Sequence, residues 1–343
     1  MAWLGGDAAA KALGVPGSTL RKMAREGRIG TKPKPDRPAD KLYRVDEGAP
    51  VAPSAQLTPR EQPGAADDGA DELAAMLGGK VAAPEPAPEK SGKAPRVWRV
   101  AGIWDVHVPD HDTMAFEAVL QWLRAEQPDE LIIGGDFGEF DSCSQHGGVA
   151  SPRRLVDEAK GCRKYLGRLR EALPAAVFTY LGGNHEDRIR RIQVAFLPTF
   201  EGAITIERLL DFDAFGVRWV PYKRLYQPTH PSGAPSKLRY IHGVYANKYH
   251  AFKHMDRYGV PIRYGHVHTS QTHLRGRSDG SVFGAFATPC LRTLEPSWLD
   301  GPSDWVHGFS IDDIMEDGGF TAHTVVMTDR QFAWNGKVYE GRP

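Results

Sequence analysis

The sequence has few cysteines, no net charge and no long apolar run, and each of these absences excludes a class of protein. Only three cysteines occur in 343 residues, and none forms a Cys-x-x-Cys pair. This excludes a disulfide scaffold or a thiolate metal cluster and indicates reduced thiols in a cytosolic protein. The 43 basic and 43 acidic residues balance. A nucleic acid or a membrane would therefore have to meet a local patch rather than the whole surface.

Membrane segments and a secretory leader are not expected. No apolar run approaches the ~20 residues that a helix needs to span a bilayer. Residues 1–15 lack the basic segment and apolar core that are typical of a signal peptide. We therefore expect a soluble, cytoplasmic protein with no membrane partner, and we find no signal for a particular oligomeric state.

Composition divides the chain into three parts. Residues 1–48 are compact in pattern and locally basic. Residues 49–95 are rich in alanine and contain eight prolines, so they bury too little apolar surface to offset the entropy of ordering and are predicted to form a flexible linker. Residues 96–343 alternate strand-like and helical runs, which predicts an α/β catalytic domain.

The first half of that domain predicts a βαβαβ unit, and the second half predicts another, mostly antiparallel sheet. The long helix at 151–173 is expected to be capped by Ser151. The expected strands of the first half are 97–104, 130–133 and 177–181, with helices at 112–125 and 151–173. The expected strands of the second half are 238–241, 261–264, 281–288, 321–328 and 331–338.

Five short polar blocks follow apolar, strand-like runs in this domain. Ligand sites in α/β sheets lie at the carboxyl ends of the strands, so the blocks should meet at one rim. Carboxylate, imidazole and amide ligands suit Mn, Fe or Zn better than a thiol-loving metal. The blocks are Asp105-Val106-His107, Gly135-Asp136, Gly183-Asn184-His185-Glu186, His242-Gly243 and Gly265-His266-Val267-His268.

The spacing of these blocks suits two neighbouring cations. Asp105 and His107 are two residues apart, so on an extended strand both would project to the same side and share one ion. Asp136 follows two glycines that allow close backbone approach, and its carboxylate could bridge both ions. The remaining ligands are Asn184, His242 and His266 for a second ion, with His268 able to reach the first.

In this order, the five blocks resemble the calcineurin-like metallophosphoesterase superfamily over roughly residues 97–330. The resemblance implies a two-sheet sandwich flanked by helices and a dinuclear centre, with Mn²⁺ as the favoured ion and Fe, Zn or Ni as alternatives. A metal-bridged hydroxide would attack phosphorus while His185 protonates or stabilises the leaving oxygen. The implied ligands are Asp105, His107, Asp136 and His268 for one metal, and Asp136, Asn184, His242 and His266 for the other.

The second block departs from the pattern of protein serine/threonine phosphatases. Glu139 stands where those enzymes have the acid that orients the catalytic histidine, so it is expected to pair with His185, and Asp141 is the competing candidate. Phe140 replaces their clamp arginine, which argues against a close protein-phosphatase relationship. Substrate contacts are then expected from a helix after the third block or from a histidine after the second: Arg188, Arg190, Arg191 and His146.

The N-terminal part has the outline of a helix-turn-helix. Asp7 can cap a helix that ends at Leu13, and Ser18 can cap a second helix that ends at Glu26. The run from residue 9 to 21 resembles MerR-type and excisionase-like winged modules, with 41–45 as a wing strand. Residues 21–44 hold nine basic and three acidic residues, which suits phosphate contacts. The candidate DNA contacts are Arg21, Lys22, Arg25 and Arg28.

Three functions are compatible with these features. The favoured one is a metal-dependent phosphoesterase that acts on phosphomonoesters or phosphodiesters and is directed to duplex DNA by residues 1–48. The second is a DNA nuclease. The third is a DNA-binding or docking protein whose phosphoesterase domain is inactive, and the intact ligand set argues against it. For residues 1–48 alone, protein docking or no separable function are the alternatives to DNA binding.

Overall fold

The computed structural model describes residues 2–5, 9, 31–33, 41–45, 97–144 and 152–341, the last range without 197, 201, 279, 297, 298 and 300. The chain divides into two compact units, residues 1–78 and 79–343. The described strands of the first unit form an antiparallel sheet in the order β1-β3-β2. They are β1 (Ala2–Gly5), β2 (Thr31–Pro33) and β3 (Lys41–Val45).

Residues 41–45, expected as a wing strand, do form a strand, β3. The two expected helices are outside the described residues except at Ala9, which is helical and buried. The expected linker and His146 are outside them as well. So are the four candidate DNA contacts, Arg21, Lys22, Arg25 and Arg28.

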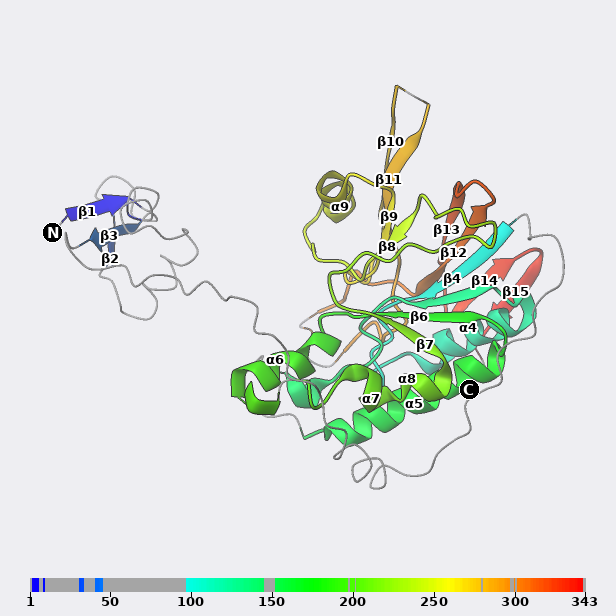
Figure 1. The fold of residues 1–343 in the computed structure, drawn as a ribbon, viewed down its shortest axis with the longest axis horizontal. Coiled ribbons are helices and arrows are strands. Elements are labelled where there is room, and N and C mark those ends of the chain that lie inside the picture. The colour runs from blue at the N-terminus through cyan, green and yellow to red at the C-terminus, as the bar shows by residue number, and fades with distance from the viewer. Residues whose placement is uncertain are drawn as a thin grey trace. The chain divides into compact units, whose positions relative to one another are not determined.

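A six-stranded sheet forms the centre of the second unit, in the order β13-β12-β4-β5-β6-β7 (Figure 1). β4 to β7 are parallel, whereas β12 pairs antiparallel with both β4 and β13. The three strands expected from the first half are confirmed as β4, β5 and β6, while β7 and β12 were not predicted. The strands are β4 (Val97–Ile103), β5 (Glu130–Ile133), β6 (Val177–Leu181), β7 (Val217–Val220), β12 (Gly308–Met315) and β13 (Phe320–Val326).

The second sheet has four strands in the order β10-β11-β9-β8. The expectation of a mostly antiparallel sheet was wrong, because β8, β9 and β11 run parallel and only β10 is antiparallel. Residues 321–328 also lie elsewhere than expected: β13 is an edge of the first sheet. The strands are β8 (Arg239–Tyr240), β9 (Ile262–Tyr264), β10 (Thr272–Gly276) and β11 (Val282–Ala287).

The run at 331–338 forms a two-stranded hairpin rather than one strand. β14 (Gln331–Trp334) turns at Asn335 and Gly336 into β15 (Lys337–Glu340). Both turn residues have positive φ, at 48° and 74°, which Asn and Gly tolerate best.

The helices cover the outer faces of the two sheets. α4 starts where predicted, because the Asp112 carboxylate accepts the N–H groups of Met114 and Ala115. α5 does not start at Ser151: its cap is Arg154, and the preceding Arg153 is held outside the helix by an ion pair with Asp110 at 2.6 Å. The helices are α4 (Thr113–Glu126), α5 (Leu155–Ala172), α6 (Glu186–Phe196), α7 (Ile206–Leu210), α8 (Phe212–Phe215) and α9 (His250–Tyr258), with short turns η1 (Asp141–Cys143) and η2 (Pro198–Phe200).

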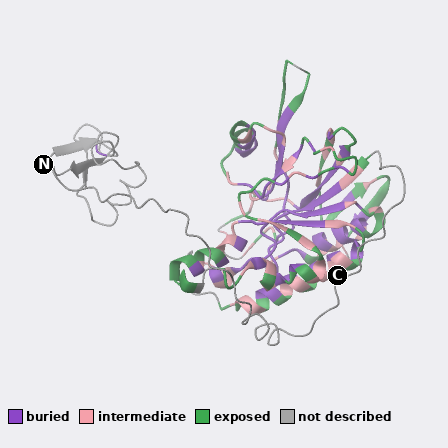
Figure 2. Ribbon diagram, viewed as in Figure 1, coloured by how far each residue is buried: buried purple, intermediate pink, exposed green. Residues whose placement is uncertain are grey.

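The second unit is thus a two-sheet α/β sandwich flanked by helices, with buried residues along the strands of both sheets (Figure 2). Three hydrophobic clusters of the described residues fill the spaces between the layers. Successive side chains of a strand point to opposite faces of the six-stranded sheet, and so contribute alternately to two of these clusters. Leu131 and Ile133 of β5 pack with α4 and α5, whereas Ile132 packs between the sheets. The third cluster lies between the four-stranded sheet and α9, around Met255 and Tyr264. Among the described residues, no helix is long and apolar enough to cross a membrane.

A buried ion pair joins the two sheets. Arg263 of β9 donates from Nε and Nη2 to the two carboxylate oxygens of Asp312 on β12, each at 2.6 Å. The same guanidinium donates to the hydroxyls of Thr288 and Thr324, and the Tyr240 hydroxyl donates to Asp312. Both charged side chains are fully buried. Because breaking such a pair leaves an uncompensated charge, it fixes how the two sheets meet.

Candidate metal centre

The five polar blocks follow β4, β5, β6, β8 and β9, and all of their residues lie in loops except Glu186, which begins α6. Asp105 and His107 are not on an extended strand, as we had expected: β4 ends at Ile103, and both residues have positive φ. Left-handed backbone at such residues costs free energy and is concentrated at functional sites. Five non-glycine block residues share it: Asp105, His107, Asp136, His266 and His268, with φ of 49°, 58°, 49°, 75° and 60°.

One group of candidate ligands consists of Asp105, His107 and His268. The Nε2 atoms of the two histidines are 3.2 Å apart, and Asp105 Oδ1 lies 3.4 Å from the nearer of them, on His268. All three side chains are buried. No described residue gives Asp105 Oδ1 a hydrogen bond, whereas Oδ2 accepts the N–H of His266. A buried carboxylate oxygen beside two imidazole nitrogens is a set of lone pairs that suits a cation.

A second group consists of Asp136, His242 and His266, with Asn184 beside it. His242 Nε2 lies 3.2 Å from Asp136 Oδ2 and 3.1 Å from Asn184 Oδ1. The other ring nitrogen of His242 donates to the Gly134 carbonyl oxygen at 3.0 Å, as ligating histidines commonly do. Burial lowers the pKa of His242, but the carboxylates of Asp136, Asp105 and Glu186 together more than offset this and raise it to about 10. The surroundings therefore favour a positive charge between these atoms.

Asp136 interacts with both groups, as a bridging carboxylate would. Burial raises its pKa, but His242, His185 and His107 together hold it well below the usual range for aspartate. Gly183 allows the approach, because a Cβ at that position would lie 2.0 Å from Asp136 Oδ1. Asp105 depends on Gly265 in the same way, since a Cβ there would lie 2.3 Å from its Oδ2. The glycines of the third and fifth blocks are thus required by the carboxylates of the first two.

Glu139 has a broader role than its expected pairing with His185. Its carboxylate accepts the Nδ1–H of His107 at 2.8 Å and Nη1 of Arg292 at 2.7 Å. His185 instead donates Nδ1–H to the Glu139 backbone oxygen at 2.7 Å, and its ring is 3.5 Å from the carboxylate. The competing candidate, Asp141, begins η1. One residue thus orients two histidines of the cluster, His107 through its carboxylate and His185 through its backbone carbonyl.

Arg191 donates to the Asn184 carbonyl oxygen at 2.8 Å, but Arg188 is the more buried arginine and the one that reaches His185. Arg188 donates to the Glu139 backbone oxygen at 2.8 Å and to His185 Nε2 at 3.1 Å. Burial lowers the pKa of His185 to about 4, so its imidazole is neutral at pH 7 and can accept this hydrogen bond. Arg190 and Arg191 are exposed and pair with Asp187.

Sequence reasoning missed two charged residues at the site. Glu186 is buried and accepts the N–H groups of Asp136 and Gly183, at 2.9 and 2.8 Å, and the Tyr180 hydroxyl at 2.6 Å. It therefore holds the loop that presents the bridging carboxylate, and its place in the third block was the available signal. Arg292 is 3% exposed and follows β11, outside every block, so only its position after a strand could have drawn attention to it.

A cavity of about 650 Å³ opens beside the cluster. His266 and His268 line one side of it, and Trp305 packs edge-on against His268 with ring centroids 4.4 Å apart. Lys248 and Gln271 line the side that faces α9. The two histidines are therefore reachable from outside through this cavity.

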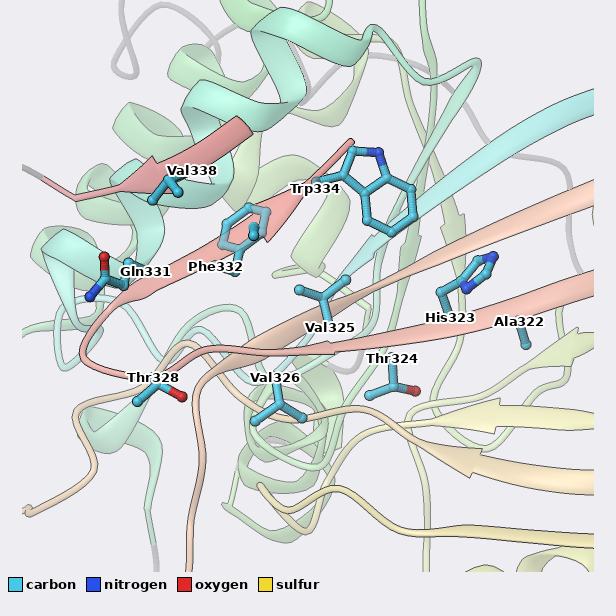
Figure 3. Close-up of a pocket in the computed structure, with 11 residues that line it drawn as sticks. Ala322, His323, Thr324, Val325, Val326, Thr328, Gln331, Phe332, Trp334 and Val338 are labelled. Atoms are coloured by element: carbon cyan, nitrogen blue, oxygen red, sulfur yellow. The ribbon is translucent and has the colours of Figure 1, made fainter. Parts of the chain in front are cut away.

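A second cavity, of about 750 Å³, lies between β13 and the β14–β15 hairpin (Figure 3). Figure 3 shows Phe332 and Trp334 on one side and Val325 and His323 on the other. Of the described residues that line it, only His323 carries an imidazole, and none carries a carboxylate or a basic aliphatic chain. Its larger volume therefore does not make it the better candidate for chemistry.

Comparison with known proteins gives distant relatives. No protein-family model matches the chain. Proteins named "Gene 54 protein" from Mycobacterium phages L5 and D29 are 25% and 28% identical to it over 257 residues, which is 71% of this chain and 98% of each relative.

Solved structures similar to this one include three of Vps29. Those from Cryptosporidium parvum and Chaetomium thermophilum have TM-scores of 0.37 and 0.35 and are 14% and 10% identical. They match 72% and 71% of this chain and 97% and 98% of their own. Wild-type Vps29 of Entamoeba histolytica, complexed with Zn²⁺, has a TM-score of 0.32 and 11% identity, covering 66% of this chain and 98% of its own. At these values the activity has to be inferred from the residues of the site itself.

Proposed function

We propose that the chain is a dinuclear, metal-dependent phosphoesterase that hydrolyses phosphomonoesters or phosphodiesters. The supporting observation is that two sets of lone-pair atoms face each other in a buried cluster. His107 and His242 each donate one ring N–H to a glutamate or a carbonyl and turn the other nitrogen toward a carboxylate. This outer support is typical of histidines that bind metal.

The donor set fits two divalent cations. Asp105, His107 and His268 would hold one ion, His242, His266 and Asn184 the other, and Asp136 both. Oxygen and imidazole donors without thiolates favour Mn²⁺, with Fe, Zn and Ni as alternatives. When bound, such a pair of ions neutralises charge on the phosphoryl oxygens and supplies a nucleophilic hydroxide at neutral pH.

The chain's own residues then position the substrate. Arg188 is partly exposed beside His185, and its guanidinium is suited to a phosphoryl oxygen because it offers two donors in a fixed fork. The Glu139 carbonyl holds His185 in orientation, with Nε2 3.7 Å from Asp136 Oδ2, which supports a role for this nitrogen at the leaving oxygen. We propose that Arg188 and His185 together stabilise that oxygen, the histidine serving as its proton donor when protonated.

Hydrolysis of p-nitrophenyl phosphate and its bis-ester with Mn²⁺ tests this function. Asp136→Ala and His185→Ala should abolish or strongly reduce turnover, while Arg190→Ala, on the exposed face of α6, should not. Unchanged rates in both site variants would refute the proposal. A folded wild-type protein with no turnover of either ester would instead favour an inactive phosphoesterase domain.

Direction of the enzyme to DNA is a separate proposal. It rests on the excess of basic residues between 21 and 44 in the sequence. The full chain should bind duplex DNA with strong salt dependence, and Arg21→Glu with Arg25→Glu should weaken this binding. If duplex binding is equal in wild type and variant, residues 1–48 are better explained as a docking segment. Cleavage of the bound DNA would favour the nuclease alternative.

A further inference from the structure

A basic surface extends from the metal centre along α9 and the β10–β11 hairpin, and we call it the arm surface. Figure 1 shows this hairpin projecting beside α9. Within the described part of the chain, none of its five exposed basic side chains forms an ion pair with a carboxylate, although Asp256 is exposed on the same helix. The five are Lys248, Lys253, Arg257, Arg275 and Arg277.

Aromatic rings alternate with these cations. Tyr249 is 66% and Phe252 40% exposed. The Lys248 ammonium lies 5.6 Å from the centre of the Tyr249 ring, and the Arg275 guanidinium lies 5.8 Å from that of Phe252. Exposed apolar groups that lie together and are rimmed by polar residues mark interaction sites. Rings interleaved with unpaired cations are the combination that binds bases and phosphates together.

Direct contacts connect the arm surface to the metal centre. The cavity beside His266 and His268 is also lined by Lys248, the first cation of the arm. Gln271 joins the two regions, because its side-chain amide donates to the Lys248 carbonyl at 3.0 Å and accepts the N–H of Ala251 at 2.8 Å. A polymer lying on the arm could therefore continue into the cavity without leaving the surface.

We propose that the arm surface binds single-stranded nucleic acid and delivers its phosphodiesters to the metal centre. Single strands fit better than a duplex, because only unstacked bases can present their faces to Tyr249 and Phe252. This inference rests on the proposed phosphoesterase function and names its substrate. Hydrolysis forms a P–O bond to the oxygen of water and breaks the P–O bond to one sugar oxygen, which leaves as a hydroxyl with a proton from water.

Binding of a fluorescent 20-nucleotide oligo-dT by the full chain, in EDTA and over a range of salt, tests the electrostatic part. Arg275→Glu with Arg277→Glu should weaken binding at least tenfold and reduce the slope of log affinity against log salt by about 1.4, since two phosphate contacts are lost. The matched control is Lys160→Glu with Lys337→Glu, the same charge change at exposed positions on α5 and β15. Equal losses in both pairs would overturn the proposal.

The aromatic part has its own test. Tyr249→Ala should weaken binding of oligo-dT and oligo-rU roughly fivefold or more, because one base loses its stacking partner. Phe196→Ala is the control, since Phe196 is 69% exposed at the end of α6. No difference between the two variants would contradict stacking. Duplex DNA bound as tightly by the arm, or vesicles with anionic lipid bound in its place, would contradict the assignment to single strands.

Comparing the hydrolysis of an oligonucleotide with that of a small diester distinguishes a failure of the arm surface from a failure of the metal centre. With Mn²⁺, the arm variants should lower the ratio of oligonucleotide hydrolysis to bis(p-nitrophenyl) phosphate hydrolysis at least tenfold, and the two controls should leave it unchanged. A wild type that hydrolyses the small diester but neither binds nor cleaves the oligonucleotide would refute the arm proposal alone. A wild type that binds the oligonucleotide through the arm but hydrolyses neither would refute the phosphoesterase function instead.

Discussion

The two sheets of the sandwich contribute different atoms to one cluster. Loops of the six-stranded sheet provide all the candidate oxygen ligands, from Asp105, Asp136 and Asn184, together with one imidazole. Loops of the four-stranded sheet provide imidazoles alone. Each of the two groups combines residues from both sheets. Neither of these two groups is complete without both sheets, so a centre built on them depends on how the sheets pack together, whereas a third set of close donor atoms, on His107, Glu139 and His185, lies on loops of the six-stranded sheet alone.

Removing one ligand from either sheet should have the largest effect. We expect Asp105→Ala and His266→Ala each to lower hydrolysis of the bis-ester by more than about 100-fold, because loss of even an outer-shell partner costs 10–100-fold. Equal losses of activity in the two variants would show that the site needs ligands from both sheets. A variant of one sheet that keeps more than a tenth of wild-type activity would show that the other sheet suffices.

Breaking the buried ion pair between the two sheets should have the second-largest effect. Arg263→Met leaves the buried Asp312 carboxylate without its main partner, so we expect the free energy of unfolding in urea to fall by about 3–5 kcal/mol. Lys237→Met is the control, because the Lys237–Asp317 pair is exposed and should contribute little to stability. Similar losses in the two variants would mean that the buried pair does not hold the sheets together.

A smaller effect is expected at the residue that orients the cluster from the six-stranded side. Glu139→Gln keeps the shape of the side chain but weakens its bonds to His107 and Arg292, so Mn²⁺ affinity should fall 10–100-fold. Asp141→Asn changes the competing acid and should have little effect. If Asp141→Asn is instead the more damaging substitution, the assignment between these two residues is reversed.

Acid should lower the stability of the protein through a buried histidine of α9, the helix that covers the four-stranded sheet. His254 on α9 is fully buried, donates to the His250 carbonyl oxygen and accepts the Val244 N–H. Burial lowers its pKa to about 4. In the unfolded chain the same imidazole has a pKa near 6.5 and therefore binds a proton more readily than in the folded protein. Its contribution to the free energy of unfolding is thus fully present above pH 6.5 and is lost as the pH falls toward 4. The loss should be about 2 kcal/mol between pH 7 and 5.

Urea unfolding of wild type and His254→Gln at both pH values measures this contribution. The variant should lose less stability than the wild type over the same interval, even though it is less stable at pH 7. An identical pH dependence in the two proteins would show that another group carries the acid sensitivity.

The parts of the fold that the sequence predicted are those governed by local patterns. β5 and β6 are short apolar runs, and they were placed at their exact bounds. β12 was missed because Asp312 and Asp313 interrupt its apolar pattern, and what makes Asp312 acceptable there is Arg263, 49 residues away in the sequence. A local window cannot contain that partner, so neither β12 nor the direction of the second sheet could be inferred.

The candidate site divides in the same way. The polar blocks could be grouped because each follows a strand, and strand ends meet at a rim. The left-handed backbone at Asp105 and His107 could not be predicted, since isolated residues of these types disfavour it and the surrounding loops impose it. Arg292 and the Glu186 contacts depend on the packing of distant loops, which has no local signal.

The number of Mn²⁺ ions bound per chain tests the central claim most directly. Calorimetric titration of the chelator-stripped full chain should give two ions for the wild type and one for His242→Ala, which leaves the group of Asp105, His107 and His268 intact. Binding of one ion or none by the folded wild type would contradict a dinuclear centre.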